Sequence, residues 1–407
     1  MKTIIIAYAC RPDQGSEEGV GFNYITAISK FSECLVITSK ENQKKLREIN
    51  LKNVQWVFIE EDIIKKKLSN IWDLIGSSIF RFIIAYSYQR WQKKAEKSIL
   101  QLIKSSKIDI IHKITYVGYR FPIYVENIPV INGPLGGIEN IPISYFNFMS
   151  IKGKLIFFIR NILNSYQRSF SINLKKKYRK NNNYIISAHT NIQYLMHKYF
   201  KKDSIVLSEI CYSNNIKNLK KNDKIINVIW VGDLEPGKNL LPLLIAKKNL
   251  QNLDIEFNLK ICGEGSEYNK LKKFVSINGI KNVKFYGNIS RNETLKLMQS
   301  SHIYVSTSLK DLTSTSLVEA MVSGCAIITT PLPGFKNAIG NAKSLYLNLD
   351  SKKDLINSLS DKLSIYINNQ LLRDNHAKST FKESSKFNHE NVSKILENFY
   401  KKILLNK

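Results

Sequence analysis

Hydroxyl groups and two carboxylates are concentrated between Val305 and Thr330, in the stretch of the sequence best suited to chemistry. A short apolar run that predicts a strand ends at Val305, and a loop crowded with serines and threonines follows it. The pattern then predicts a helix that the side chain of Ser314 or Thr315 caps and that Gly324 ends. Backbone N–H groups at the start of such a helix bind anions, and a pyrophosphate would suit the site.

Two acids flank this predicted anion site. Asp311 lies in the loop, and Glu319 lies one turn inside the helix. The run Ala326–Thr329 predicts a buried parallel strand after the helix, so the whole segment is a strand, a loop, a helix and a strand. An ordinary β-α-β unit could also have acids on its solvated face, and the spacing alone leaves both interpretations open.

The second half of the chain alternates regularly between strands and helices. Strands are predicted at Ile225–Val231, Phe257–Cys262 and Val283–Tyr286, and each is followed by a glycine-containing loop and a helical stretch. The third of these helices opens with the capping-box pair Ser290 and Glu293. Strands that alternate with helices of this length predict a doubly wound parallel sheet.

The first half follows a similar plan. An apolar run at Thr3–Ala9 predicts a first strand rather than a secretion signal, because it is too short for the latter. We therefore predict an α/β protein of two Rossmann-like domains facing each other across a central cleft. The predicted boundaries are 1–207 for the first domain, 208–224 for a linker, 225–378 for the second domain, and 379–407 for a terminal helix that returns to the first domain.

The acid at 311, seven residues, and then Glu-Ala-Met-x-x-Gly resembles the donor-site signature of the retaining glycosyltransferases of family 4, which have the GT-B fold. The resemblance implies that Glu319 binds the ribose of a nucleotide sugar and that Asp311 lies against the sugar ring. It implies further that the helix start at Thr315, Ser316 and Leu317 holds the diphosphate. The family usually has Glu where this chain has Asp311.

A second part of the resemblance follows the predicted strand Ile225–Val231. The family usually has Gly-Arg-Leu-x-x-x-Lys there, and this chain has Gly232, Asp233, Leu234 and Lys238. The resemblance implies that Lys238 neutralises the leaving phosphate, which would replace a metal ion. Asp233 replaces the usual arginine and removes one phosphate contact. By the same resemblance, the nucleotide is bordered by Gly263, Gly287 and Ile289.

Three motifs of the first half also resemble the family. The turn Gly-Ser-Glu-Glu-Gly-Val-Gly implies that Gly15 and Ser16 contact the donor and that Glu17 faces the acceptor, although glycines there could serve the geometry of the turn alone. The second motif contains His112, Thr115 and Tyr116, and the third contains Gly136, Gly137 and Glu139. The resemblance implies a catalytic role for His112 and places the other five residues on the side of the cleft where the acceptor binds.

Aromatic and basic residues alternate between Ile143 and Lys180. This pattern suits an amphipathic segment lying on an anionic bilayer, and it equally suits a core helix with a solvated basic face. The aromatics of Ile71–Lys104, Trp72 among them, have helical spacing and are more typical of a core. The formal net charge of +28 is compatible with nucleic acid, an anionic membrane, anionic substrates or a compositional bias. The chain contains no nucleic-acid-binding motif.

The five cysteines are scattered and odd in number, which favours reduced core residues in a cytoplasmic protein. We therefore expect a cytoplasmic enzyme that is peripheral on the inner face of the membrane, with no cofactor and no metal. It would move a sugar from a UDP-sugar to a lipid-linked saccharide of a bacterial surface polysaccharide, with retention. The alternative is a catalytically degenerate GT-B protein that serves as a membrane-associated assembly partner. A nucleic-acid-binding protein, explained by charge alone, is the third hypothesis.

Overall fold

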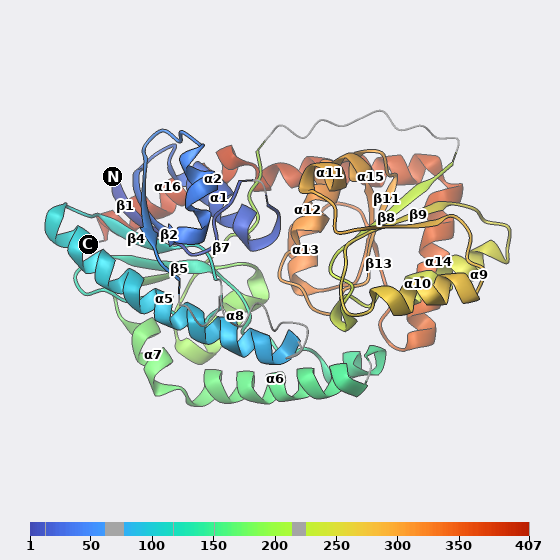
Figure 1. The fold of residues 1–407 in the computed structure, drawn as a ribbon, viewed down its shortest axis with the longest axis horizontal. Coiled ribbons are helices and arrows are strands. Elements are labelled where there is room, and N and C mark those ends of the chain that lie inside the picture. Colours follow the sequence, from blue (N-terminus) through green and yellow to red (C-terminus); the bar gives the residue numbers. More distant parts are fainter. Residues whose placement is uncertain (13, 62–76, 117, 150, 214–224, 407) are drawn as a thin grey trace. The chain divides into compact units, whose positions relative to one another are not determined.

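Two parallel β-sheets organise the chain, one in each of two structural units (Figure 1). The structure is a computed structural model that describes residues 1–12, 14–61, 77–116, 118–149, 151–213 and 225–406. Unit 1 consists of Met1–Glu139, Asn164–Tyr212 and His389–Lys407. Unit 2 consists of Asn140–Leu163 and Ser213–Asn388. The α/β class and the two Rossmann-like sheets predicted from the sequence are confirmed.

The sheet of unit 1 has seven strands in the order β3-β2-β1-β4-β5-β6-β7, and every neighbouring pair is parallel. Its central strands are buried along most of their length, as their continuous apolar sequences require in a sheet with both faces covered. The strands are β1 (Lys2–Ala7), β2 (Glu33–Ser39), β3 (Val54–Ile59), β4 (Ile110–Lys113), β5 (Val130–Leu135), β6 (Asn183–Ser187) and β7 (Ile205–Val206).

Helices flank this sheet. They are α1 (Ser16–Ile28), α2 (Gln43–Arg47), α5 (Ser77–Ser105), the end of α6 (Ile151–Phe170), α7 (Ile172–Arg179), α8 (Thr190–Phe200) and α16 (His389–Leu405), with the 3₁₀ turn η1 (Lys40–Asn42). The helix predicted over Ile71–Lys104 corresponds to α5. Its predicted first turns, including Trp72, lie outside the described residues, as does most of the predicted linker.

The C-terminal helix α16 joins unit 1 through a buried polar contact with β4. Nδ1 of His112 lies 2.7 Å from the hydroxyl of Tyr400, and Nε2 lies 2.9 Å from the carbonyl oxygen of Gly133. A carbonyl only accepts, so Nε2 carries the proton and Nδ1 accepts from the tyrosine hydroxyl. Burial lowers the pKa of His112 to about 4, which keeps the ring neutral at physiological pH.

The neutral state of His112 predicts a pH-dependent stability. The pKa of His112 is lower in the folded state than in the unfolded state, where it is 6.5. The contribution of the neutral ring to the free energy of unfolding is therefore fully present above pH 6.5 and is lost as the pH falls toward 4. We expect the contribution to reach roughly 3 kcal/mol. Denaturant unfolding at a series of pH values should show the stability advantage over His112→Asn shrinking as the pH falls. A difference that stays constant between pH 7 and 4.5 would contradict this, and the exposed His197 supplies the control substitution His197→Asn.

The sheet of unit 2 has six parallel strands in the order β10-β9-β8-β11-β12-β13. In both sheets, the strand order reverses direction next to the first strand of the sheet, at β1/β4 in unit 1 and at β8/β11 in unit 2. Ligands of doubly wound folds bind outside the carboxyl ends of the strands at such a point. The strands are β8 (Asn227–Val231), β9 (Asn258–Cys262), β10 (Val283–Gly287), β11 (Ile303–Ser306), β12 (Ala326–Thr329) and β13 (Leu345–Tyr346).

Eight helices and helical turns pack around this second sheet in the described residues of unit 2, besides the start of α6 and the 3₁₀ turns η4 (Pro236–Lys238) and η5 (Ser385–Phe387). The predicted capping box of Ser290 and Glu293 is present at the start of α11. The eight are η3 (Ile143–Phe148), α9 (Leu241–Gln251), α10 (Tyr268–Ile277), α11 (Arg291–Gln299), α12 (Thr315–Val322), α13 (Pro333–Ile339), α14 (Lys352–Asn368) and α15 (Gln370–Ser384).

The structure groups Asn140–Leu163 with unit 2, whereas the sequence analysis placed this segment in the first domain. The segment belongs with unit 2 because the two share a hydrophobic core: Phe148 and Met149 are buried in the same cluster as Trp230 and Leu243. Amino-acid composition does not specify which of two cores an apolar turn enters.

Candidate functional site

The loop between β11 and α12 contains the predicted anion site. Ser314 occupies the N-cap position of α12 with φ of 69°, and its side chain makes no capping hydrogen bond. Its hydroxyl lies instead 3.0 Å from the Ser316 hydroxyl. The expectation that a Ser314 side chain caps the helix is therefore wrong. Because N–H groups of a first helical turn have no partner within the helix, those of Thr315, Ser316 and Leu317 are suited to an anion.

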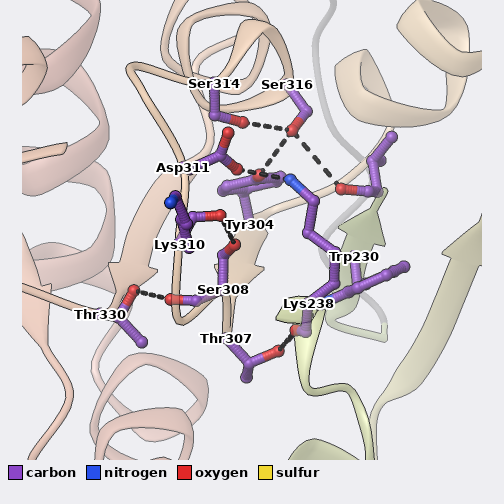
Figure 2. Close-up of polar contacts among 11 residues, drawn as sticks. Trp230, Lys238, Tyr304, Thr307, Ser308, Lys310, Asp311, Ser314, Ser316 and Thr330 are labelled. Atoms are coloured by element: carbon purple, nitrogen blue, oxygen red, sulfur yellow. Dashed lines mark hydrogen bonds and ion pairs between the residues drawn. The ribbon is translucent and has the colours of Figure 1, made fainter. Parts of the chain in front are cut away.

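Three hydroxyl groups meet at the start of α12 (Figure 2). The Ser316 hydroxyl donates to the carbonyl oxygen of Val231 over 3.4 Å and lies 2.9 Å from the Tyr304 hydroxyl. Tyr304 is buried, and burial raises its pKa above the usual range, so the phenol stays a neutral donor. The sequence analysis treated Tyr304 only as part of an apolar strand and missed this contact.

Lys238 and Asp311 form an ion pair at the strand-order reversal of unit 2. Their Nζ and Oδ2 atoms are 2.5 Å apart, and both side chains are only partly exposed. Lys238 follows β8 and Asp311 follows β11, and these strands are neighbours in the sheet. The parallel arrangement brings the ends of both strands to one edge, so residues 73 positions apart in the sequence meet there (Figure 2).

The loop that carries Lys238 is anchored on two sides. Thr307 donates to the carbonyl oxygen of Lys238 over 2.8 Å and accepts from the indole N–H of Trp230. On the other side, a Cβ placed on Gly237 would lie 3.5 Å from the ring of Phe157, which belongs to α6. The loop backbone thus has little freedom, and the lysine amine is held near the start of α12.

Glu319 lies on α12 and pairs with Arg291 at the start of α11. Its Oε1 accepts from Nε of Arg291 over 2.8 Å, and the carboxylate is buried. Burial raises the pKa of Glu319, while the Arg291 charge and hydrogen bond oppose that shift. The sequence analysis did not select Arg291, because no spacing rule places the start of one helix beside the middle of another.

Glycines close the neighbouring strand ends. Gly263 has φ of +135°, and a Cβ there would lie 1.9 Å from the carbonyl oxygen of Gly232. Its N–H donates to the carbonyl oxygen of Gly287 over 2.8 Å. Ile289 follows, half-buried, two residues after β10. The side chain of Leu317 is fully buried, so only its backbone could contact a donor.

In unit 1 the structure brings three of the predicted residues together at the reversal between β1 and β4. The backbone N–H of Tyr116 donates to the carboxylate of Glu17, and the hydroxyl of Thr115 accepts from the N–H of Ala9 over 3.4 Å. A Cβ on Gly21 would lie 2.1 Å from the carbonyl oxygen of Ala9. The last glycine of that turn is therefore required by packing, as the geometric interpretation proposed.

The other predicted residues of unit 1 have different partners. Glu139 accepts from the side chain of Asn191, and its other oxygen lies 3.3 Å from Nε2 of the buried His189. Gly136 pairs with Gly118 in an isolated bridge, and Gly137 has φ of +76°. Neither Asn191 nor His189 was selected from the sequence, which gives no signal for them.

His112 has hydrogen-bond partners on both ring nitrogens within unit 1. A ligand contact for this side chain has no support in that geometry, and its catalytic role stays a prediction. Gly15 and Ser16 lie at the start of α1 in unit 1, whereas the other donor-site candidates lie in unit 2. Their contact with the donor likewise stays a prediction.

All five cysteines are buried and form no disulfide, and burial raises the thiol pKa to about 12 at Cys34 and Cys262. Across the described ranges, no three His, Cys, Asp or Glu side chains lie together in a way that could hold a metal ion. The cations of the site are Lys238 and Arg291, each paired with an acid, and the start of α12 adds partial positive charge.

The two parallel sheets with their flanking helices have the GT-B fold. Residues 212–383 match the family described as "Glycosyl transferases group 1", which confirms the resemblance found in the motifs of this segment. A glycosyltransferase crystal structure from Rickettsia africae has the same fold, with a TM-score of 0.66, 14% identity, and coverage of 100% of this chain and 99% of that one.

Curated relatives carry glycosyltransferase names. An uncharacterized glycosyltransferase of Methanocaldococcus jannaschii is 26% identical over 71% of this chain and 74% of its own length. The phosphatidylinositol N-acetylglucosaminyltransferase GPI3 subunit of Saccharomyces cerevisiae is 25% identical over 46% of this chain and 38% of its own. An N,N'-diacetylbacillosaminyl-diphospho-undecaprenol alpha-1,3-N-acetylgalactosaminyltransferase of Campylobacter jejuni is 27% identical over 29% of this chain and 30% of its own. The chain thus spans less than two fifths of the last two relatives.

Proposed function

We propose that this protein transfers a sugar from a UDP-sugar to an acceptor hydroxyl with retention at the anomeric carbon. The observation that carries the proposal is the Lys238–Asp311 pair beside the hydroxyl-lined start of α12, with Glu319 on the same helix. The cation of Lys238 suits the leaving phosphate, and the backbone N–H groups at the start of α12 suit the diphosphate. The buried carboxylate of Glu319 suits the ribose.

The donor would be bound along α12. Its diphosphate would accept hydrogen bonds from the N–H groups of Thr315, Ser316 and Leu317, and the Lys238 amine would share its charge between the phosphate and Asp311. Arg291 occupies Oε1 of Glu319, so a ribose hydroxyl would donate to Oε2. The charge and hydrogen bond of Arg291 oppose the effect of burial on the pKa of Glu319 and so favour the ionised carboxylate, which accepts.

The reaction needs no covalent intermediate on the protein. The bond between the anomeric carbon and the phosphate oxygen breaks, and a bond from that carbon to the acceptor oxygen forms on the same face. The acceptor proton passes to the leaving phosphate, and UDP is released. Lys238 and the helix start stabilise the charge that develops on that phosphate, while Asp311 would lie against the sugar ring. No metal ion is required, because these groups supply the positive charge.

The acceptor proposed is a lipid-linked saccharide of a bacterial surface polysaccharide, reached from the cytoplasmic face of the membrane. The names of two relatives support a lipid acceptor, since one contains phosphatidylinositol and the other diphospho-undecaprenol. The chain's net charge of +28 also suits an anionic membrane.

A second candidate is a non-catalytic GT-B protein that assists assembly at the membrane. Two observations favour it: Asp233 replaces the usual arginine, and the Lys238 charge is already neutralised by Asp311. Such a protein would bind UDP weakly or not at all and would transfer no sugar.

A panel of nucleotides and nucleotide sugars distinguishes these functions. We expect a UDP-sugar to raise the Tm by several degrees with EDTA present, because saturation at about 100 times Kd stabilises by about 2.7 kcal/mol. GDP- and ADP-sugars serve as controls, and the anomeric configuration of the product is measured by NMR. UDP binding without transfer favours the second candidate, and a Tm unchanged by every nucleotide rejects the donor site itself.

A further inference from the structure

Helix α6 turns its apolar side outward. Nine positions of its described residues are exposed, and eight of them are apolar, whereas Lys154 is the ninth. We call these eight residues the α6 stripe. The stripe consists of Ile151, Leu155, Phe158, Ile159, Ile162, Leu163, Tyr166 and Phe170, and their exposure runs from 39% at Leu163 to 87% at Ile151. Their spacing of three, four and seven residues places them along one face of a helix about 30 Å long.

The opposite face of α6 carries Phe157, which packs against the hydrophobic cluster of unit 2, and polar side chains that hydrogen-bond to the protein. Asn161 donates to the carbonyl oxygen of Ile141 over 2.8 Å and accepts from its N–H over 3.0 Å. The buried Asn164 donates to the carbonyl oxygen of Ile138, and Arg168 donates to the same oxygen over 3.0 Å. Rotating the helix to bury the stripe would break these bonds. The core-helix interpretation is therefore wrong for α6, although Phe148 and Tyr178 of the same segment are buried.

The charge around the stripe has one sign. The segment from Ile143 to Lys180 contains nine lysines and arginines and no acid. After the single residue Ser171, α7 follows α6 and carries exposed cations at Lys176, Lys177 and Arg179. A contact between the stripes of two copies of the chain would bring together two segments whose charge has the same sign. A partner with an anionic surface and an apolar interior fits both the apolar α6 stripe and the cations beside it.

We propose that the α6 stripe lies in the headgroup region of an anionic phospholipid bilayer, with the cations of α7 near the lipid phosphates. The helix would lie in the plane of the membrane. In the described part of the chain, no helix is both long and apolar enough to cross a bilayer. The inference goes beyond the reaction proposed above and does not depend on it, because a non-catalytic protein would dock in the same way.

Sedimentation with vesicles tests the proposal. The full chain should bind vesicles of phosphatidylcholine with about 30% phosphatidylglycerol at least tenfold more tightly than pure phosphatidylcholine, and added salt should weaken that binding. The double substitution Phe158→Asp and Ile162→Asp should lower the affinity by at least tenfold. Leu371→Asp is the matched control, because Leu371 is 73% exposed on α15 and lies outside the stripe. It should leave binding unchanged.

Two further measurements make the outcome decisive. The melting temperature and the Tm shift with UDP are recorded for each variant, so that loss of folding or of the nucleotide site is recognised separately from loss of lipid binding. Light scattering reports the oligomeric state. Lipid binding that both variants retain overturns the proposal, as does a wild-type dimer that only the stripe substitutions dissociate.

Discussion

Replacing Lys238 with alanine should lower the rate of sugar transfer by about 10²- to 10³-fold, the usual cost of removing one preorganised group that stabilises transition-state charge. Lys238 is the single lysine or arginine of the loop 232–239, and the hydrogen bond from Thr307 holds the loop backbone near the start of α12. No other cation of that loop can therefore replace it. Steady-state rates with saturating UDP-sugar measure the effect. Lys270→Ala, which removes a lysine whose side chain is 66% exposed on α10, should leave the rate unchanged.

A substitution of the partner acid Asp311 should affect UDP binding and sugar transfer differently. Asp311→Asn removes the charge that neutralises Lys238, so UDP should bind as tightly as in the wild type or more tightly. Transfer should nevertheless fall, because the acid beside the sugar is lost. Calorimetry with UDP separates the two effects. Weaker UDP binding in both variants would show that the pair acts only as a structural ion pair.

Replacing Arg291 with alanine should both destabilise the protein and weaken nucleotide binding. The substitution leaves the buried carboxylate of Glu319 without its cation, and breaking such a pair costs about 3 kcal/mol. The protonation of Glu319 that follows would replace a charged acceptor for the ribose with a weaker neutral one. Denaturant unfolding and calorimetry with UDP measure the two losses, and Arg291→Lys, which keeps the charge, should show smaller ones.

The second acid of the motif provides the control for this result. In the double variant Arg291→Ala, Glu319→Gln, no buried charge remains, so most of the lost stability should return while nucleotide binding stays weak. The direction in which the stability deficit of Arg291→Ala changes with pH also follows. Because burial raises the folded-state pKa of Glu319, the deficit of Arg291→Ala should be absent below the unfolded value of about 4.5 and should grow as the pH rises above it. Additive stability losses in the double variant would contradict this explanation.

The sequence predicted the two sheets because the alternation of apolar runs, glycine turns and amphipathic stretches is a local property. Asp311, Glu319 and Lys238 were selected because they flank a predicted helix start or follow a predicted strand and because they match the motifs of the resemblance, and the structure brings Asp311 and Lys238 into an ion pair. Arg291 and Tyr304 were missed, because their partners belong to other elements and no spacing connects them.

Orientation was the other property that the sequence left open. The apolar side of the segment 143–180 was visible, but which side faced the protein depended on whether the inner asparagines found backbone partners. Asn161 and Asn164 do so, at Ile141 and at Ile138. The same reasoning applies to His112, whose position after a strand suggested a ligand contact, while its actual partner Tyr400 lies 288 residues away.

Phe157 lies beside Gly237 of the loop that carries Lys238, so α6 links two parts of the molecule that have different proposed tasks. One rigid helix carries the outward stripe on one side and Phe157 beside the lysine loop on the other. If lipid holds that helix in place, it also restrains the wall of the phosphate pocket, and turnover would respond to the composition of the surrounding leaflet. Such interfacial activation would make the protein most active where its acceptor is embedded and slow in free solution.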